Sequence, residues 1–520
     1  MIPEPAEVSQ PNVGPDPSGG LGLAFWMLVP VVGALAGLGA GLLMLLLRLT
    51  EHLGWPAYHD NFLQAVRAAG AARRIGVLLI AGVLVFGLRS LLRRPTGGHA
   101  AELTESIWFH AGRMPVLPTL SRGIVSIIIV GLGASLGREA APKQIGALVG
   151  SRLGLRLRLP PGQRRLLVAF GAGAGMAAVY NVPFGGALFA LEVLLGTLAL
   201  PLLAPALATS LIATAAAWLI LPDRATYSMP SYTTTPGLMA WALLAGPLAG
   251  LLSVGYVRLI ALADAHRFAT GSMRLLAPLG VFLALGLLSL GLPEVLGNGK
   301  DVVQLALDGQ VSLTVLALVA LLKPLCTAAC LGSGAPGGLF TPTLTLGAAF
   351  GALTGALWSS LVPGAPSAAY ALIGATAVLA ASSQGPVSAI LLVTELTGRL
   401  NAMVPIMLAV AAAVLLARRL ESRSIYSGRI HAGRERAQQR PGAVPRISSA
   451  ARYAELMHRL LELGDTCRSL EVIDEQGQVI GQIEAERVRH PEPWQRPLET
   501  ATARDFIDES SRNPERREPR

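Results

Sequence analysis

Residues 135–150 read SLGREAAPKQIGALVG. This stretch places three charged residues, Arg138, Glu139 and Lys143, directly after the apolar run IVSIIIVGLGA. An ionisable side chain is costly in lipid, so one that follows an apolar run of this kind marks a functional site by default. The stretch therefore predicts a membrane protein that holds charge within its apolar part.

The composition also indicates a membrane protein. Of the 520 residues, 52% are hydrophobic and only 14% are charged, whereas soluble domains have roughly 25% charged residues. The 58 glycines would let membrane helices approach one another closely. The net charge of +10 comes from arginine clusters that flank apolar runs, such as Arg73–Arg74 and Arg418–Arg419, as the positive-inside rule describes. This pattern excludes nucleic acid as the expected partner.

The distribution of charge predicts three regions. Residues 1–20 are polar, rich in proline and glycine, and lack the basic start of a signal peptide. Residues 21–430 form the membrane region, and residues 431–520 form a soluble tail with a helix over 449–464 and a strand–turn–strand over 470–484. The apolar runs have about the length that crosses a bilayer; they cover residues 21–49, 75–92, 115–136, 166–197, 199–221, 237–262, 275–293, 311–331, 338–362, 370–396 and 402–418.

An internal repeat divides the membrane region into halves of about 21–225 and 235–430. Residues 170–192 align with residues 373–395 at an offset of 203, with Pro183 matching Pro386 and Glu192 matching Glu395. Just upstream, glycines and alanines align at an offset of 201; Gly137 matches Gly338. Duplicated halves with glycine- and proline-broken segments in matching positions indicate a transporter whose binding site lies between the halves.

The two matched broken segments, 135–150 and 332–344, share one design. In each, a glycine-rich turn and a proline precede a helix-forming run. Backbone N–H groups at a helix start, together with the positive end of the helix dipole, favour an anion. We therefore expect two helix starts, one from each half, to converge on one anion.

Glu139 has two interpretations. A carboxylate at this helix start carries the same charge as the anion, so it can occupy the anion site and leave when it is protonated, as a gate, a proton carrier or both. Alternatively, it caps its own helix or pairs with Arg138. We expect structural roles for Arg138 and Lys143, and also for Glu192 and Glu395 at helix ends or between helices.

An intramembrane enzyme is a remote alternative. Such an enzyme needs a cluster such as His with Asp, or Ser with His, within the apolar runs, and the eight histidines lie mostly outside them. Cys326 and Cys330 lie four residues apart on one apolar run and fit packing better than metal binding. We expect no cofactor and no metal.

Five motifs in this chain resemble those of the CLC family of chloride channels and chloride/proton exchangers. They occur in the family's order, and the third is long and specific. The motifs are GREAAPKQIG (137–146), YNVPFGGALFALE (180–192), GSGAPGGLFTP (332–342), GPVSAILLVTELTG (385–398) and SIYS (424–427). Other stretches, ALFALEVLLGTL and GNGKDVVQ, are most similar to the family's bacterial voltage-gated ClcB-type branch.

The resemblance implies an all-α membrane fold of two inverted repeats with broken helices, in a homodimer with one pore per subunit. It implies multiple passes through the bacterial inner membrane with both termini in the cytoplasm. It implies a glutamate gate at Glu139 and chloride transport by a voltage- or pH-gated channel, with chloride/proton exchange as the alternative. The implied chloride-binding residues are Arg138, Glu139 and Ala140 for the outer site, and Leu339, Phe340 and Tyr426 for the central site.

Three departures from the family pattern bear on the mechanism. The usual Gly-Arg-Glu-Gly-Pro reads Gly-Arg-Glu-Ala-Ala-Pro here, with the proline at Pro142. The family's anion-binding serine falls at Gly98, which has no hydroxyl, and the neighbouring His99 fits a polar loop residue better than a ligand. Val193 stands where the best-known exchangers carry a second glutamate, and valine cannot carry a proton.

The tail has a weak resemblance to one partial CBS-type motif.

Overall fold

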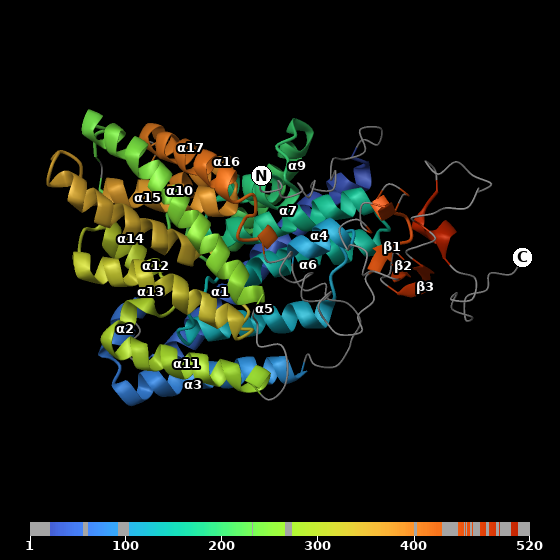
Figure 1. The fold of residues 1–520 in the computed structure, drawn as a ribbon, viewed down its shortest axis with the longest axis horizontal. Helices are drawn as coiled ribbons and strands as arrows, with labels where there is room; N and C mark the ends of the chain where they lie inside the picture. The colour runs from blue at the N-terminus through green and yellow to red at the C-terminus, as the bar shows by residue number, and fades with distance from the viewer. Residues whose placement is uncertain are drawn as a thin grey trace, which may run out of the picture. The chain divides into compact units, whose positions relative to one another are not determined.

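The computed structural model describes residues 21–55, 61–91, 103–230, 232–265, 273–399 and 403–428, and short segments between residues 446 and 507. The chain divides into a helical unit, formed by residues 1–94 and 100–432, and a smaller unit, formed by residues 95–99 and 433–520. Figure 1 shows the ribbon of both units.

The described part of the helical unit is built from α-helices, with one π-helical turn and one 3₁₀ turn. Its elements are α1 (Leu23–Gly54), α2 (Phe62–Ala68), α3 (Ala71–Leu91), α4 (Leu103–Phe109), α5 (Val116–Gly131), α6 (Ala140–Arg156), α7 (Pro161–Tyr180), α8 (Pro183–Leu188), the π-helix η1 (Phe189–Leu195), α9 (Leu200–Ala217), α10 (Pro236–Ala265), α11 (Met273–Gly291), the 3₁₀ turn η2 (Pro293–Val295), α12 (Lys300–Leu307), α13 (Leu313–Gly332), α14 (Phe340–Ser359), α15 (Ser367–Ser383), α16 (Pro386–Thr397) and α17 (Met403–Leu420).

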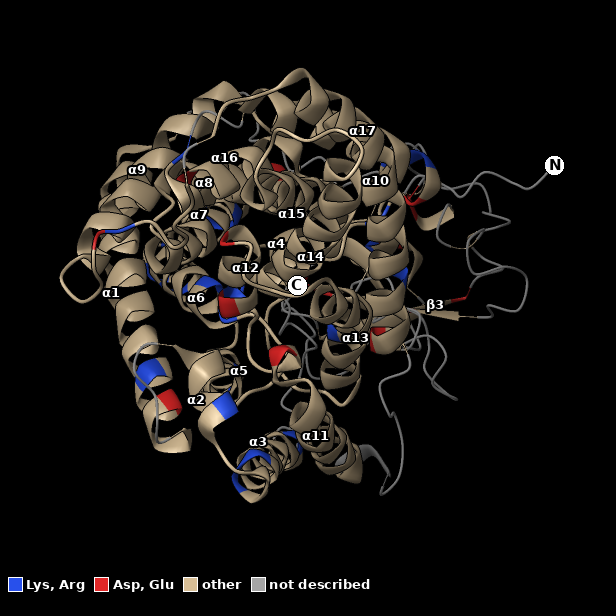
Figure 2. Cartoon of the chain, turned by 90° about the vertical axis from the view of Figure 1, so that its left-hand side faces the viewer, with Lys and Arg blue, Asp and Glu red and all other residues tan. Residues whose placement is uncertain are grey.

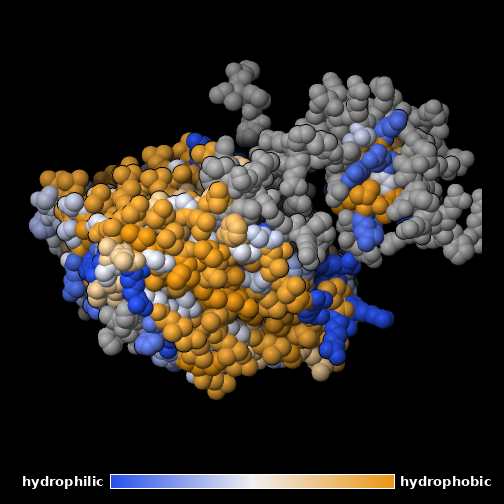
Figure 3. Space-filling view, turned by 90° about the horizontal axis from the view of Figure 1, so that it is seen from below, coloured by the Kyte–Doolittle hydropathy of each residue, from blue (hydrophilic) through white to orange (hydrophobic). Residues whose placement is uncertain are grey.

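Seven of these helices, α1, α3, α9, α10, α13, α14 and α17, are long and apolar enough to cross a membrane. Shorter apolar helices accompany them: α5, α8 with η1, α11, α15 and α16. Charged residues are sparse on these helices in Figure 2. In Figure 3 the visible face of the helical unit is largely hydrophobic, with hydrophilic side chains toward its two ends. A hydrophobic face of this kind is compatible with contact to lipid. The helices that form it are also compatible with lipid, because they satisfy their backbone hydrogen bonds internally.

Close helix packing shows the repeat in three dimensions. Gly146 of α6 lies against the backbone of Gly171 in α7, and Gly347 of α14 lies against the backbone of Gly374 in α15. A methyl group at any of these four positions would overlap the facing backbone. Glycine lets the helices touch where lipid provides no hydrophobic drive for association. The two pairs are equivalent at the offsets of the sequence repeat, so the predicted duplication is confirmed.

Two of the apolar runs are divided into separate helices, as their interruption by glycine and proline indicated. The run 166–197 divides into α7, α8 and η1, and the run 370–396 divides into α15 and α16. The breaks fall at Asn181 and Gln384, which adopt left-handed backbone angles with φ of 58° and 59°. A left-handed residue ends each first helix, and the proline two residues later starts the next one.

The smaller unit contains a sheet of β1 (Arg446–Ser448), β2 (Ser469–Ile473) and β3 (Val479–Glu484), followed by the 3₁₀ turn η3 (Ala503–Phe506). β2 pairs in parallel with β1 and antiparallel with β3, which confirms the predicted strand–turn–strand. Leu470, Val472, Ile483 and Phe506 form part of its buried core. Much of the predicted helix over 449–464 lies outside the described residues.

Candidate functional site: two helix starts around a buried carboxylate

The two broken segments meet directly. The N–H of Gly137 donates to the carbonyl of Gly338 at 2.7 Å, and the N–H of Gly338 donates to the carbonyl of Gly137 at 2.8 Å. This isolated antiparallel bridge joins equivalent residues of the two repeats. Because α6 begins three residues after Gly137 and α14 two residues after Gly338, the bridge holds the two helix starts side by side, as the repeat predicts.

The Glu139 carboxylate fills the space at this junction. Glu139 is completely buried, and its Oε1 accepts the backbone N–H of Phe340, the first residue of α14, at 2.7 Å. A Cβ at Gly137 or Gly338 would overlap the carboxylate. We call these two glycines the glycine cradle. The carboxylate therefore occupies the position at which an anion would meet the N-terminus of α14.

The alternative roles for Glu139 are not what the structure shows. Glu139 precedes α6, but its side chain makes no capping hydrogen bond to that helix. The described residues also include no ion pair between Glu139 and Arg138. Instead, the guanidinium of Arg138 lies over the ring of Tyr180, 5.1 Å from its centroid.

Tyr180 and Thr341 complete the surroundings of the carboxylate, and sequence reasoning missed both. The Tyr180 hydroxyl donates to Oε2 of Glu139 at 3.4 Å and lies 2.8 Å from the hydroxyl of Thr341. The Tyr180 ring also packs on Phe340, with centroids 5.3 Å apart. One feature of the sequence could have identified Tyr180 as a site residue: it stands where its apolar run is interrupted, at the start of the motif YNVPFGGALFALE (180–192).

The remaining residues discussed from the sequence fall into three groups. Ala140 begins α6, and the buried Leu339 is the N-cap of α14, so both lie at the junction. Tyr426 lies in the turn after α17, and the N–H of its neighbour Ile425 donates to Ser382 of α15 at 2.9 Å. Gly98 and His99 lie outside the described residues.

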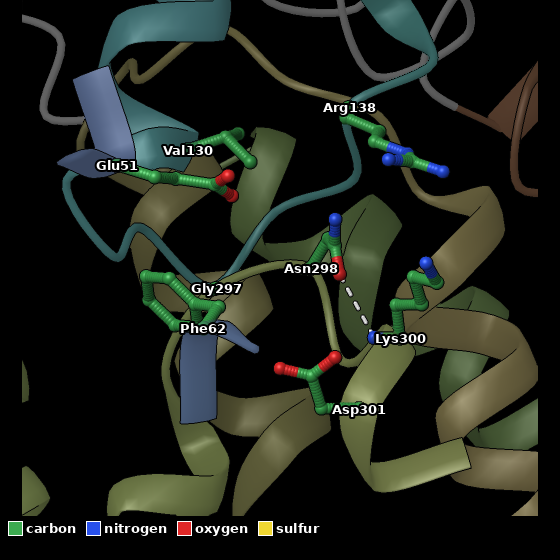
Figure 4. A pocket seen from close by; sticks show the side chains of 8 residues that line it. All are labelled: Glu51, Phe62, Val130, Arg138, Gly297, Asn298, Lys300 and Asp301. Atoms are coloured by element: carbon green, nitrogen blue, oxygen red, sulfur yellow. Dashed lines mark hydrogen bonds between the residues drawn. The ribbon is translucent and has the colours of Figure 1, made fainter. Parts of the chain in front are cut away.

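Arg138 also lines a cavity of about 50 Å³. Figure 4 shows the residues that line it: Glu51, Phe62, Val130, Arg138, Gly297, Asn298, Lys300 and Asp301. The buried Nε of Arg138 has no hydrogen-bond partner among the described residues. Lys323 of α13, itself fully buried, donates to the carbonyls of Val295, Leu296 and Gly297 and so supports the cavity wall.

Lys300 begins α12, which is not one of the membrane-spanning helices. Burial, followed by the nearby charge of Arg138, lowers the pKa of Lys300 to about 8. The ammonium is therefore positive below about pH 8 and neutral above it, which makes the cavity more attractive to an anion at the lower pH.

The resemblance implies chloride transport, and on that basis we expect Lys300→Gln to change its alkaline pH dependence. In the wild type, the apparent affinity for chloride should fall as the pH rises from about 7 to about 9.5, because Lys300 loses its charge in that range. Lys300→Gln should show the lower affinity at both values, and Lys300→Arg the higher affinity at both. Chloride concentration series with protein in liposomes measure this; an alkaline fall that persists in Lys300→Gln would contradict it.

Glu192 and Glu395 confirm the structural roles predicted for them. Glu192 of η1 accepts the N–H groups of Val387 and Ser388 at the start of α16, at 3.2 and 2.6 Å. Glu395 of α16 accepts the N–H groups of Phe184 and Gly185 at the start of α8, at 3.0 and 2.6 Å. Each repeat therefore caps a helix of the other with a carboxylate, which stabilises helix N-termini.

The comparisons with known proteins agree with this geometry. The family described as "Voltage gated chloride channel" matches residues 76–418. A putative chloride channel protein, ClcB-like, of Ralstonia nicotianae is 35% identical, and the match covers 71% of this chain and 86% of that protein. The voltage-gated ClC-type chloride channel ClcB of Citrobacter koseri is 33% identical, with coverage of 67% and 84%.

Solved structures share the fold. A slow cyanobacterial Cl⁻/H⁺ antiporter superposes with a TM-score of 0.71 at 23% identity, covering 81% of this chain and all of that one. A CLC-type fluoride/proton antiporter gives 0.64 at 20% identity, with coverage of 78% and 97%. The chain therefore belongs to the voltage-gated chloride channel (CLC) family. Its predicted fold of two inverted repeats with broken helices is confirmed, as is its similarity to the bacterial ClcB-type branch.

Proposed function

We propose that this protein transports chloride across a membrane and that Glu139 is its gate. The observation that carries the proposal is the 2.7 Å hydrogen bond from the N–H of Phe340 to the Glu139 carboxylate, inside the glycine cradle. In this state the carboxylate occupies the position that chloride needs. Chloride binds when the carboxylate leaves.

Protonation of Glu139 supplies the opening step. Loss of the negative charge weakens the hydrogen bond from Phe340, because charge-assisted hydrogen bonds are roughly twice as strong as neutral ones. A chloride ion then takes the vacated N–H and the positive end of the α14 dipole. Arg138, Ala140 and Leu339 line the same junction with their backbones, and Tyr426 offers its hydroxyl from the cytoplasmic side.

Conduction through a voltage- or pH-gated channel is our first mechanism, and chloride/proton exchange is the alternative. Val193 favours the channel: it stands beside Gly385 and has no group that carries a proton. The adjacent Glu192 already accepts two backbone N–H groups. Membership of the CLC family favours either mechanism over the enzyme alternative.

A reversal-potential measurement separates the two mechanisms. Purified protein in liposomes under a chloride gradient and a proton gradient should set a potential that follows chloride alone if it is a channel. Movement of protons against their own gradient, driven by chloride, would contradict the channel mechanism and establish exchange.

We further propose a homodimer in the bacterial inner membrane, with both termini in the cytoplasm and residues 1–20 and 431–520 outside the bilayer. Phe184 of α8 and Val387 of α16 are 50% and 40% exposed at equivalent positions of the two repeats. Exposed apolar side chains beside the capped helix starts suit a contact between two copies. Light scattering of the detergent-solubilised protein should give the mass of two chains, and Phe184→Arg with Val387→Arg should give one.

A further inference from the structure

We propose that Lys323 and Thr327 of α13 are positioning residues for the gate. Together they fix residues 133–139, which we call the gate segment, so that the Glu139 carboxylate lies against the N–H of Phe340. This inference rests on the proposed function, because it names two residues that act through the same gate. Both hold backbone carbonyls and act on the carboxylate only through the position of its chain.

The buried ammonium of Lys323 holds a loop that in turn holds the gate segment. Lys323 is fully buried, and its Nζ donates to the carbonyls of three successive residues, Val295, Leu296 and Gly297, at 3.0, 3.2 and 2.7 Å. These bonds match the three donors of an ammonium group. The N–H of Gly297 then donates to the carbonyl of Gly133 at 2.9 Å. Because a buried charge is costly without its hydrogen bonds, the loop cannot easily move away from α13.

Thr327 holds the gate segment directly. It is fully buried, and its hydroxyl donates to the carbonyl of Ser135 at 2.9 Å. Thr327 lies one helical turn after Lys323, on the same face of α13. Ser135 shortly precedes Gly137, which forms the bridge to Gly338. Since α13 continues directly into the segment that contains Gly338, one helix sets the positions of both broken segments.

The position of the gate segment decides how well the carboxylate meets the N–H of Phe340. Hydrogen bonds weaken as their distance and angle leave the preferred range, and this one is charge-assisted. A gate segment released from α13 holds the ionised carboxylate less strongly, so the gate opens at a higher pH than in the wild type. Arg138, Tyr180 and Tyr227 also lie in the electrostatic surroundings of Glu139, and the variants below leave these three residues unchanged.

Chloride efflux from liposomes, measured with the full-length protein from about pH 4.5 to about pH 8.5, tests the inference. Thr327→Val keeps the shape of the side chain but removes the donor. We expect it to move the midpoint of the flux increase to higher pH by about 0.5 unit or more. Thr327→Ser, which keeps the hydroxyl, should have the wild-type midpoint. Lys323→Met should move the midpoint in the same direction as Thr327→Val.

Thr376→Val of α15 is the matched control. Thr376 is also fully buried, but its hydroxyl donates within its own helix, to Leu372 at 2.8 Å. This variant should keep the wild-type midpoint. In a Glu139→Gln background, Thr327→Val should leave the flux unchanged, because the gate through which it acts is already open. General damage to the fold would lower the flux in that background too.

A wild-type midpoint in Thr327→Val would overturn the inference. So would unchanged hydrogen–deuterium exchange in the gate segment of Thr327→Val, where we expect faster exchange, and this measurement does not depend on flux or on recovery of Lys323→Met. The proposed function is tested separately by Glu139→Gln. If that variant loses the pH response while Thr327→Val keeps the wild-type midpoint, only the positioning role is wrong. If Glu139→Gln keeps the pH response, the gate itself is wrong.

Discussion

Glu139→Gln is expected to make chloride flux independent of pH. In the wild type the ionised carboxylate holds the N–H of Phe340. Flux measured at about pH 4.5 should exceed flux at about pH 7.5 by about tenfold or more, because protonation removes the charge that strengthens this hydrogen bond. Glutamine has the size of glutamate but no charge to lose, so the variant imitates the protonated gate throughout.

The measurement is chloride efflux from liposomes at both pH values. Glu395→Gln is the matched control, because it also replaces a carboxylate that accepts backbone N–H groups at a helix start but does not lie in the glycine cradle. The control should keep the pH response of the wild type. If Glu139→Gln keeps that response too, Glu139 is not the gate.

Gly338→Ala is expected to abolish flux, with a loss of about a hundredfold or more. A methyl group there would overlap the carboxylate of Glu139, and it would remain in the anion position after the carboxylate leaves. A loss of that size corresponds to about 3 kcal/mol of barrier. The methyl group itself is the obstacle, so adding Glu139→Gln should not restore flux.

A second glycine substitution controls for general damage. Gly255 of α10 has open space where its Cβ would stand, so Gly255→Ala should transport as the wild type does. Size-exclusion chromatography should show that both variants remain folded. Normal flux in folded Gly338→Ala would mean that the anion does not pass through the glycine cradle.

Local patterns were enough to predict much of this molecule. The repeat, the two glycine-rich helix starts and the buried Glu139 are all visible in the chain, because helix starts depend on glycine, proline and N–H groups that are close in sequence. The capping roles of Glu192 and Glu395 followed from their matching positions. Broken helices were also predicted from the glycines and prolines that interrupt the apolar runs. Hydropathy alone did not reveal the left-handed residues, Asn181 and Gln384, at which two of these runs divide.

Only the tertiary structure decided which residues contact the Glu139 carboxylate. Tyr180 stands 41 residues from Glu139, and Phe340 stands 201 residues away; no local pattern links them. Their contact depends on α7 and α14 packing against the start of α6, through glycines whose missing side chains let backbones touch. The sequence by itself therefore determined that a charge is held between two repeats. Only the packing of the helices decided that the Glu139 carboxylate lies on the α14 amide, and that Lys143 lies over the rings of Phe189 and Tyr426, because such contacts join segments that only the folded chain brings together.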